Sequence, residues 1–352
     1  MVETEININP GFKLNGKYYS KDELLNFCMN DSSENIEVYH FIIDWLNKRQ
    51  TIRIQTSGST GDPKVYLIKK NKMIASAKKT GEFFKLKQGD KSLLCLPIKF
   101  IAGKMMVVRA LVLGLDLYVK TPSNNPLKGI KKNFKFVALT PYQLSNSIKN
   151  IDKFRYIIIG GSSVNNSLKE KIFRKTKGVF ETYGMTETLS HIAVKNLSTG
   201  KKEFEALPGV KFKAKNNNLL IIAPHISKRI IKTNDIIKLI SEKKFIWIGR
   251  KDFIINSGGI KINPEVVENK LNKFYLDRFI ICGIPSQKLG EQVVIVFEKR
   301  IPENYNLLFN KLDTYERPKG AYFLKSFKNV NGKISRKYIQ NEIKKLKNEK
   351  SN

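Results

Sequence analysis

The sequence predicts an α/β fold, with a large N-terminal domain and a small α+β domain at the C-terminus. Three patterns predict it. Up to about residue 190, β-type runs (KSLLCLP, LDLYV, FKFVALT, YIIIGG) alternate with helical stretches, which is typical of a largely parallel sheet flanked by helices. From about residue 205 to 250 strand-like runs follow one another directly. Beyond GRKD at 249–252, a short unit of strands and helices begins.

The first elements are two helices and a strand. In the segment 17–49 the apolar residues recur at helical spacing, which predicts two helices. These residues are Leu24, Leu25, Cys28, Phe41, Ile42, Trp45 and Leu46. The run TIRIQ at 51–55 then predicts a short strand that leads into a loop rich in Gly, Ser and Thr.

The later elements divide the chain into two predicted domains. The runs VKFKA, LLIIA, IIKLI and KFIWIG predict a β-rich subdomain packed beside the first sheet. The chain closes with a predicted helix whose apolar face is Ile339, Ile343 and Leu346 and whose other face is lysine. We therefore expect an N-terminal domain over residues 1–249 and a C-terminal domain over residues 250–352.

Length and composition indicate an ordinary globular protein. A chain of 352 residues with 41% hydrophobic content is long enough for two domains with substantial cores. The opening segment lacks the apolar run of a signal peptide, and no later run reaches membrane-spanning length, so we expect a cytoplasmic protein without membrane insertion. Cys28, Cys95 and Cys282 show no CxxC spacing, which disfavours a disulfide framework or a zinc site and predicts buried thiols.

The formal charge of +33 first suggests a nucleic-acid partner or an anionic membrane surface. The lysines, however, are spread along the whole length, mixed with Asn and Ile, and do not form one basic arm with interleaved aromatic residues. The charge therefore reads as a general compositional bias, and nucleic acid is not the expected partner. A positive field would still favour anionic substrates such as ATP.

The sharpest local feature is TSGSTGDPK at 56–64, which follows a predicted strand. Its hydroxyls, glycines and lysine can bind phosphate oxygens, although the spacing is not that of a Walker A loop. Taken alone, the same residues also suit a surface turn.

TSGSTGDPK resembles the phosphate loop of the superfamily of acyl-CoA synthetases, luciferases and peptide-synthetase adenylation domains. Four more segments resemble this superfamily's motifs, in the same order: ETYGMTET (181–188), TND (233–235), GRKDFIINSGGIKINPEVVE (249–268) and NGKISR (331–336). The resemblance implies an adenylate-forming N-terminal domain and an enzyme that uses ATP and Mg²⁺ to activate a carboxylic acid. The acyl group would then pass to a thiol, expected to be that of coenzyme A, after the small domain rotates about a hinge.

The resemblance assigns the ATP-binding residues by segment. Those expected to enclose the β- and γ-phosphates are Thr56, Ser57, Gly58, Ser59, Thr60, Gly61 and Lys64. Tyr183, followed by Gly184, would stack against adenine, with Gly160, Gly161 and Ser162 lining the same pocket. Asp235 and Arg250 would bind the ribose. Without the resemblance, Tyr183 would be read as a core residue and the last two as a surface ion pair.

The remaining assignments concern the chemistry. Glu187 would hold Mg²⁺, which prefers carboxylate and phosphate oxygens, and Thr186 would bond the α-phosphate. Lys333 would bridge the attacking carboxylate and the α-phosphate.

The resemblance also assigns the hinge region. Asp252 falls at the hinge position. Ser257, Gly258 and Gly259 would face the adenylate beside the arm of coenzyme A, or would simply close a hairpin.

One segment bears on the acid. LPIKFIAGKMMVVRALVLG (96–114), followed by FVALTPYQL (136–144), is similar to the corresponding region of the o-succinylbenzoate–CoA ligases of menaquinone biosynthesis, including their arginine, here Arg109. Phe100, expected in the acyl pocket, stands where those ligases often have His, and Ala102 replaces a frequent Ser. Arg109 suits an acid with a second carboxylate, unless it lies at a helix end facing water. His191 is expected to be structural.

Two alternatives stay open. The acid could be another aryl or short-chain acid, or the acceptor a carrier protein. In a different class, the chain could be a basic nucleic-acid-binding protein on an inactive adenylating fold. We expect a monomer or a homodimer.

Overall fold

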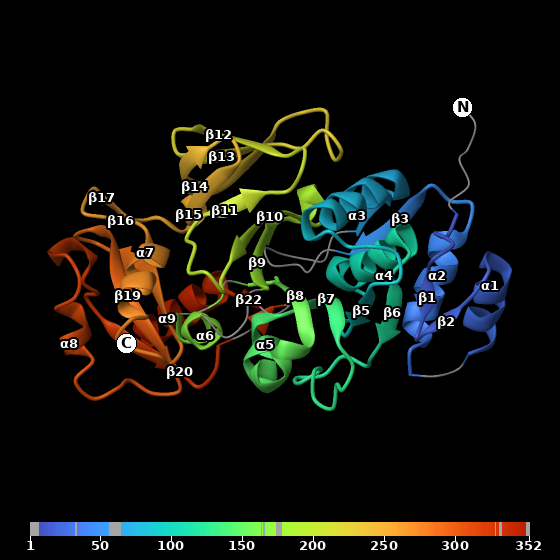
Figure 1. Ribbon diagram of the computed structural model, residues 1–352. Coiled ribbons are helices and arrows are strands. Elements are labelled where there is room, and N and C mark those ends of the chain that lie inside the picture. The colour runs from blue at the N-terminus through green and yellow to red at the C-terminus, as the bar shows by residue number, and fades with distance from the viewer. Residues whose placement is uncertain are drawn as a thin grey trace.

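The computed structural model describes residues 7–31, 34–55, 65–162, 164, 166–173, 178–327, 329–330 and 333–349. Its helices are α1 (Lys21–Asn30), α2 (Ile36–Leu46), α3 (Lys70–Phe84), α4 (Ile101–Leu113), α5 (Pro141–Ser147), α6 (Asn166–Ile172), α7 (Pro264–Leu271), α8 (Asn306–Phe309) and α9 (Arg336–Glu349). The two helices predicted before residue 50 are present as α1 and α2. The chain forms two lobes, called here the N-terminal part (residues 7–250, up to the end of β15) and the C-terminal part (residues 251–349) (Figure 1).

One large sheet organises the N-terminal part. Its strands in spatial order are β12 (Lys211–Lys215), β13 (Asn218–Ile222), β14 (Ile231–Ser241), β15 (Lys244–Arg250), β11 (Phe204–Ala206), β10 (His191–Asn196), β9 (Val179–Gly184), β8 (Phe154–Ile159), β7 (Phe134–Leu139), β5 (Lys91–Leu94), β6 (Asp116–Val119), β1 (Lys13–Leu14) and β2 (Lys17–Tyr18). The run from β6 to β9 is parallel, which confirms the α/β fold predicted from the alternation.

The predicted β-rich subdomain is present, but its strands continue the first sheet and do not pack beside it. The segment 205–250 is not a separate sheet packed beside the first, because β10 pairs antiparallel with β9 and carries the hydrogen bonding on into β11 and β15. Hydrophobic patterns identify strands, but they do not show which edge a strand joins. The consequence for the site is direct, since β9, β14 and β15 belong to one continuous sheet.

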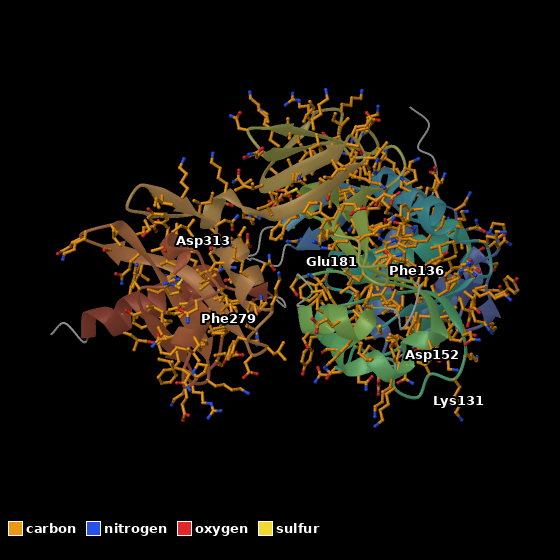
Figure 2. The ribbon with its side chains drawn as sticks, turned by 60° about the vertical axis from the view of Figure 1, so that its left-hand side comes forward. Lys131, Phe136, Asp152, Glu181, Phe279 and Asp313 are labelled. Atoms are coloured by element: carbon orange, nitrogen blue, oxygen red, sulfur yellow. The ribbon has the colours of Figure 1, made fainter. Side chains whose placement is uncertain are left out.

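Helices cover both faces of the parallel strands. Phe136 and Ala138 of β7 pack with α3 and α4, whereas Val137 and Leu139 face α5 and α6. This alternation follows from the two-residue period of a strand, and it explains why β7 is apolar throughout. In Figure 2 Phe136 lies within the N-terminal part.

The C-terminal part has a smaller sheet of its own. It contains β16 (Ile255–Ser257), β17 (Ile260–Ile262), β18 (Phe279–Ser286), β19 (Gly290–Glu298) and β20 (Ala321–Leu324), ordered β17-β16-β19-β18, with β20 beside β19. Phe279, within this part in Figure 2, belongs to one of its two cores. Two short hairpins complete the described chain: β3 (Thr51–Gln55) with β4 (Val65–Lys69), and β21 (Asn329–Val330) with β22 (Lys333–Ile334).

The closing helix agrees with its prediction except at one position. Ile339 and Ile343 of α9 are fully buried, but Leu346 is 36% exposed, because it lies near the end of the helix. Cys28, Cys95 and Cys282 are buried, as expected. Among the described residues, no helix has the length and apolarity needed to cross a membrane.

Candidate active site

The carboxyl ends of β8 and β9 lie side by side at one edge of the large sheet. The two strands are parallel, with Ile159 opposite Glu181. The segment 160–162 follows β8 directly, and Tyr183 and Gly184 end β9. The structure therefore brings the predicted adenine-pocket residues Gly160, Gly161, Ser162, Tyr183 and Gly184 to the same edge, where α/β sheets usually bind ligands.

Gly184 lies where β9 meets the start of β10. A Cβ atom on Gly184 would stand 2.5 Å from the carbonyl oxygen of Ser190 and 2.8 Å from Cα of His191. Both are backbone atoms, so the approach requires glycine. Gly161 has a φ of +95°, a backbone conformation that residues with a Cβ atom rarely adopt.

Asp235 is the centre of a buried polar group on β14. It is 6% exposed, and its carboxylate accepts hydrogen bonds from the Tyr183 hydroxyl and from Trp247 Nε1, the latter at 3.2 Å. The Tyr183 ring meets the Phe245 ring edge to face, with centroids 5.2 Å apart. Burial, together with the negative charge of Asp235, raises the pKa of Tyr183, so its hydroxyl remains a donor. The sequence did not identify Trp247 as a partner of this site.

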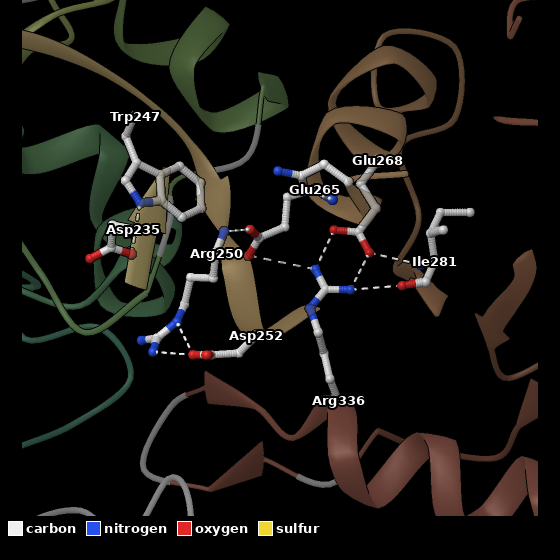
Figure 3. A network of polar contacts seen from close by, with 9 residues as sticks. Asp235, Trp247, Arg250, Asp252, Glu265, Glu268, Ile281 and Arg336 are labelled. Carbon is white, nitrogen blue, oxygen red and sulfur yellow. Dashed lines mark hydrogen bonds and ion pairs between the residues drawn. The ribbon is translucent and has the colours of Figure 1, made fainter. Parts of the chain in front are cut away.

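Arg250 and Asp252 lie next to Asp235 (Figure 3). Arg250 is the cross-strand neighbour of Asp235, and its guanidinium pairs with Asp252 Oδ2 at 2.6 Å. Asn234 Nδ2 donates to the other oxygen of Asp252 at 2.8 Å. The predicted ribose residues and the predicted hinge residue thus form one cluster, although Arg250 is engaged by Asp252 and not by Asp235.

Several predicted residues lie wholly or partly outside the described chain. Thr56–Lys64 is not described, but Gln55 and Val65 at its two ends are paired across β3 and β4. Thr186 and Lys333 are described only in their backbone. Lys333 is in β22, opposite Val330, and the β21–β22 hairpin lies on the side of the C-terminal part that faces the N-terminal part (Figure 1).

Glu187 is the predicted ligand of Mg²⁺. It is exposed, in a short 3₁₀ segment directly after β9, at the same edge as Tyr183. Within the described chain no group of three metal-ligating His, Cys, Asp or Glu side chains occurs. A single open carboxylate fits a magnesium ion whose other ligands are phosphate oxygens and water.

Arg109 is buried in the middle of α4, and the alternative of a helix end facing water was wrong. The side chain is 2% exposed. Its Nη2 donates to Ser190 Oγ at 2.7 Å and approaches His191 Nδ1 at 3.4 Å, while Nε has no hydrogen-bond partner in the described chain. No described carboxylate pairs with it. Burial lowers the pKa of Arg109 to about 9, so the group is still charged at neutral pH.

His191 continues this polar group into the core. Its Nε2 lies 3.5 Å from Thr80 Oγ1, and Thr80 in turn donates to the carbonyl oxygen of Ser76. Burial and the positive charge of Arg109 hold the pKa of His191 well below its usual value, so the imidazole is neutral. A neutral ring can accept from Arg109 at Nδ1 and donate to Thr80 at Nε2, which is the structural role expected from the sequence.

Phe100 is the residue that precedes α4, where it is partly buried. It lies nine positions before Arg109, roughly 13 Å along the helix axis. Of the two predicted acyl-site residues, Phe100 therefore lies at the N-terminal end of α4 and Arg109 lies inside the helix. An acid that reached both would have to be extended.

Gly258 and Gly259 form the two-residue turn between β16 and β17. Their φ angles of +58° and +81° are those that such a hairpin needs, so the structural alternative describes their present position. This hairpin lies at the outer end of the C-terminal part, away from the β21–β22 hairpin (Figure 1). The structure does not bring these glycines together with Tyr183 and Asp235, and their contact with the adenylate stays a prediction.

A second polar group, not predicted from the sequence, joins the end of β15 to α7 and α9. Arg336, three positions after Lys333, binds both oxygens of Glu268 at 2.7 and 2.6 Å (Figure 3). Glu265 accepts the backbone N–H of Arg250 at 2.8 Å. Arg336, Glu265 and Glu268 lie inside two of the quoted motifs (331–336 and 249–268), but the resemblance assigned no role to them.

The chain matches a known protein family and is similar to ligases of known function. The family model of AMP-binding enzymes matches residues 32–224. The 2-succinylbenzoate–CoA ligase of Haemophilus influenzae is 24% identical over 348 residues, covering 90% of this chain and 76% of the relative. That of Escherichia coli is 25% identical over 272 residues, covering 72% and 60%.

Solved structures agree in fold. An acyl-CoA synthetase (AMP-forming)/AMP-acid ligase II-like protein from Dyadobacter fermentans is 32% identical, with a TM-score of 0.61, and covers 90% of this chain and 98% of its own. An o-succinylbenzoate coenzyme A synthetase from Bacillus subtilis, in complex with ATP and magnesium ion, is 19% identical with a TM-score of 0.71 over 91% of this chain and 82% of its own. From the matched residues and the shared fold, the chain belongs to the family of AMP-binding enzymes, that of the AMP-forming ligases.

Proposed function

We propose that the chain activates o-succinylbenzoate with ATP and transfers the acyl group to coenzyme A. The observation that carries the proposal is Arg109, a buried guanidinium with no carboxylate partner in the described chain. A buried charge without a partner is costly, whereas the second carboxylate of an aromatic dicarboxylic acid would supply one. A fatty acid or a plain aryl acid would leave Arg109 unpaired.

The position of Arg109 agrees with this use. Ser190 and His191, which contact the guanidinium, directly precede and begin β10, and Gly184 at the end of β9 is in close contact with the same two residues. Tyr183 immediately precedes Gly184 in the chain, so it lies close to the two residues that contact Arg109. An acid bound by its second carboxylate at Arg109 could present its other carboxylate near the carboxyl ends of the strands, where the nucleotide is expected.

The proposed first half-reaction is attack of the acid's carboxylate on the α-phosphorus of ATP, which forms acyl-AMP and releases pyrophosphate. Asp235 would accept hydrogen bonds from the ribose hydroxyls, since its oxygens have lone pairs beyond those used by Tyr183 and Trp247. Lys333 would lie between the two anions and reduce their repulsion. Mg²⁺ held by Glu187 would offset the charge that builds up on the departing pyrophosphate.

In the second half-reaction the thiol of coenzyme A attacks the acyl carbonyl and AMP leaves. For this step we propose that the C-terminal part rotates about Asp252, which would remove Lys333 and bring Gly258 and Gly259 to the adenylate. Their left-handed turn has no Cβ atoms, so a pantetheine arm could pass close to the backbone.

The proposed substrate is tested by pyrophosphate release with ATP and Mg²⁺ across a panel of acids, with and without coenzyme A. The panel holds o-succinylbenzoate, benzoate, short-chain acids and fatty acids. Preference for the aromatic dicarboxylate supports the proposal. Preference for another acid would leave the proposed ligase reaction standing and would rule out o-succinylbenzoate as the substrate. Silence throughout, together with salt-sensitive binding to RNA or DNA, would favour the nucleic-acid-binding alternative.

The proposed role of Lys333 has its own test. Lys333→Ala should lower pyrophosphate release by about a hundredfold or more, because the bridge between the two anions is lost. Formation of the thioester from supplied acyl-AMP should be unchanged, and Lys337→Ala serves as the matched control on the same segment. Equal loss of both half-reactions would contradict the assignment.

A further inference from the structure

A carboxylate connects the two parts of the chain across the hinge. Glu265, the second residue of α7, accepts the N–H of Arg250 at 2.8 Å, and Arg250 is the last residue of β15 (Figure 3). The other oxygen of Glu265 lies 3.9 Å from Arg336 Nη2. Glu265 and Arg336 are 14% and 13% exposed, so the contact is largely shielded from water.

The backbone of β15 is packed closely against the start of α7. A Cβ atom on Gly249 would stand 2.6 Å from Oε2 of Glu265 and within 2.4 Å of the Asn263 side chain. Asn263 is the N-cap of α7 and bonds the N–H of Glu265. The absence of a side chain at position 249 therefore allows this contact.

The same carboxylate lies beside the segment that carries Lys333. Arg336 begins α9 and is held by Glu268 and by the carbonyl oxygen of Ile281 at 2.8 Å. The other partner of Glu265, Arg250, lies opposite Asp235 on the neighbouring strand. Glu265 is thus placed between the predicted ribose site and the predicted catalytic lysine, and its two contacts belong to opposite sides of Asp252.

We propose that Glu265 is a positioning residue that fastens α7 to β15 and so holds the orientation in which the β21–β22 hairpin faces the N-terminal part. The inference rests on the proposed function, since it assigns Glu265 a role in the rearrangement between the two half-reactions. Arg250 precedes the hinge and Glu265 follows it. Rotation about Asp252 must therefore break the hydrogen bond between them, whereas the contact with Arg336 can move with the C-terminal part.

The charge of Glu265 sets the direction of a pH effect. Burial raises its pKa to about 7, and Glu268 and Asp235 also raise it, whereas Arg336 and the Arg250 N–H lower it. Asp252, the remaining charged neighbour at the hinge, is paired with Arg250. Rotation would return Glu265 toward water and toward its ordinary pKa. Protonation near and below pH 7 therefore favours the present orientation, and a rise in pH weakens it.

Two substitutions separate these effects. Glu265→Gln keeps an acceptor for the Arg250 N–H without a charge, so it should hold the present orientation at every pH. Glu265→Ala removes the acceptor. Glu291→Gln is the matched control, because Glu291 also accepts a backbone N–H, that of Asn256 at 2.8 Å, but both residues lie after the hinge.

The experiment measures the distance between the two parts in the full-length protein without substrate, by energy transfer between dyes. The dyes are attached through Lys149→Cys and Lys325→Cys, both exposed positions, while the native cysteines are buried. At pH 6, Glu265→Ala should reduce the ratio of the present orientation to other orientations by about tenfold, as expected for the loss of one hydrogen bond. The wild type should shift between pH 6 and pH 8.5, whereas Glu265→Gln should not.

The activity assay adds an independent reading. Glu265→Ala should slow pyrophosphate release more than thioester formation from supplied acyl-AMP, with Glu291→Gln unchanged. Identical distance distributions in wild type and Glu265→Ala would overturn the inference. So would equal loss of both half-reactions with a lower melting temperature, since that result indicates a purely structural residue. Because the distance measurement needs no turnover, an inactive wild type would count against the proposed function alone.

Discussion

Arg109 is held by the folded chain in a charged state that its described neighbours do not neutralise. Ser190 and neutral His191 accept from it, and Nε has no partner among the described residues. In a protein interior, hydrogen bonds to neutral groups only partly replace the hydration that a guanidinium loses. The residue is therefore better explained by what it binds than by what it contributes to folding.

This explanation predicts that Arg109→Met stabilises the substrate-free protein. Methionine fills a similar volume without a charge, so the free energy of unfolding at pH 7 should rise by roughly 1–4 kcal/mol. Denaturation by urea with and without the substitution measures the difference. A loss of stability of that size would show that the contacts with Ser190 and His191 outweigh the cost of burial.

At the scale of the element, the site depends on where β9, β10 and β14 meet. Tyr183 at the end of β9 bonds Asp235 of β14, and Ser190, just before β10, bonds Arg109 of α4. The two contacts are joined by the close approach of Gly184 to the backbone of Ser190 and His191. The residues predicted to bind the nucleotide and those predicted to bind the acid therefore share one structural junction.

We expect Gly184→Ala to disturb both pockets. Its Cβ atom would meet backbone atoms at 2.5 and 2.8 Å, which cannot move without shifting β10, so stability should fall by roughly 1–3 kcal/mol. Pyrophosphate release should fall with it. Gly320→Ala is the control, because there the nearest atom is a tyrosine ring carbon at 3.3 Å. If Gly184→Ala had the same melting temperature and activity as the control, the close approach of Gly184 to Ser190 and His191 would not be needed by either group of residues.

The sequence predicted the elements well and their connections less well. The parallel strands and the helices α1, α2 and α9 follow from periodicity, because burial of one face fixes the spacing of apolar residues. The continuation of the sheet from β9 into β10, β11 and β15 does not, because pairing between distant strands leaves little trace in either strand alone.

The site shows the same division. Asp235 and Arg250 were found through their motifs, and the structure places them on neighbouring strands. Glu265, Arg336 and Trp247 were missed, since each acts through a contact across elements. Glu265 and Arg336 even lie inside quoted motifs, but the resemblance gave them no role. Arg109 was found by similarity, but only the structure shows that it is buried and lacks a described carboxylate partner.

At the scale of the whole molecule, charged side chains are concentrated around Asp252, the predicted hinge. Asp235, Arg250 and Asp252 lie on one side of Glu265, and Glu268 and Arg336 lie on the other (Figure 3). A buried carboxylate in such a place makes the free energy of unfolding depend on pH. Under the role proposed for Glu265, the orientation of the two parts depends on pH as well.

We predict that the stabilising effect of Glu265→Gln grows between pH 5 and pH 8. The pKa of Glu265 is raised from 4.5 to about 7, so the folded chain holds a proton that the unfolded chain releases. The stability this gives is full below pH 4.5 and is lost as pH rises through 7, by up to roughly 3 kcal/mol. Gln cannot lose a proton. Melting temperatures of both proteins across this range check the prediction, and parallel curves would refute it.

The most direct test of the account is a comparison of two acids in two proteins. The quantity is kcat/KM for pyrophosphate release, with o-succinylbenzoate and with the same acid lacking its ring carboxylate, in the wild type and in Arg109→Met. We predict that the wild type prefers the dicarboxylate by about a hundredfold or more, and that the variant loses this preference while keeping its rate with the simpler acid. An unchanged preference in Arg109→Met, or no preference in the wild type, would contradict the assignment of the acid.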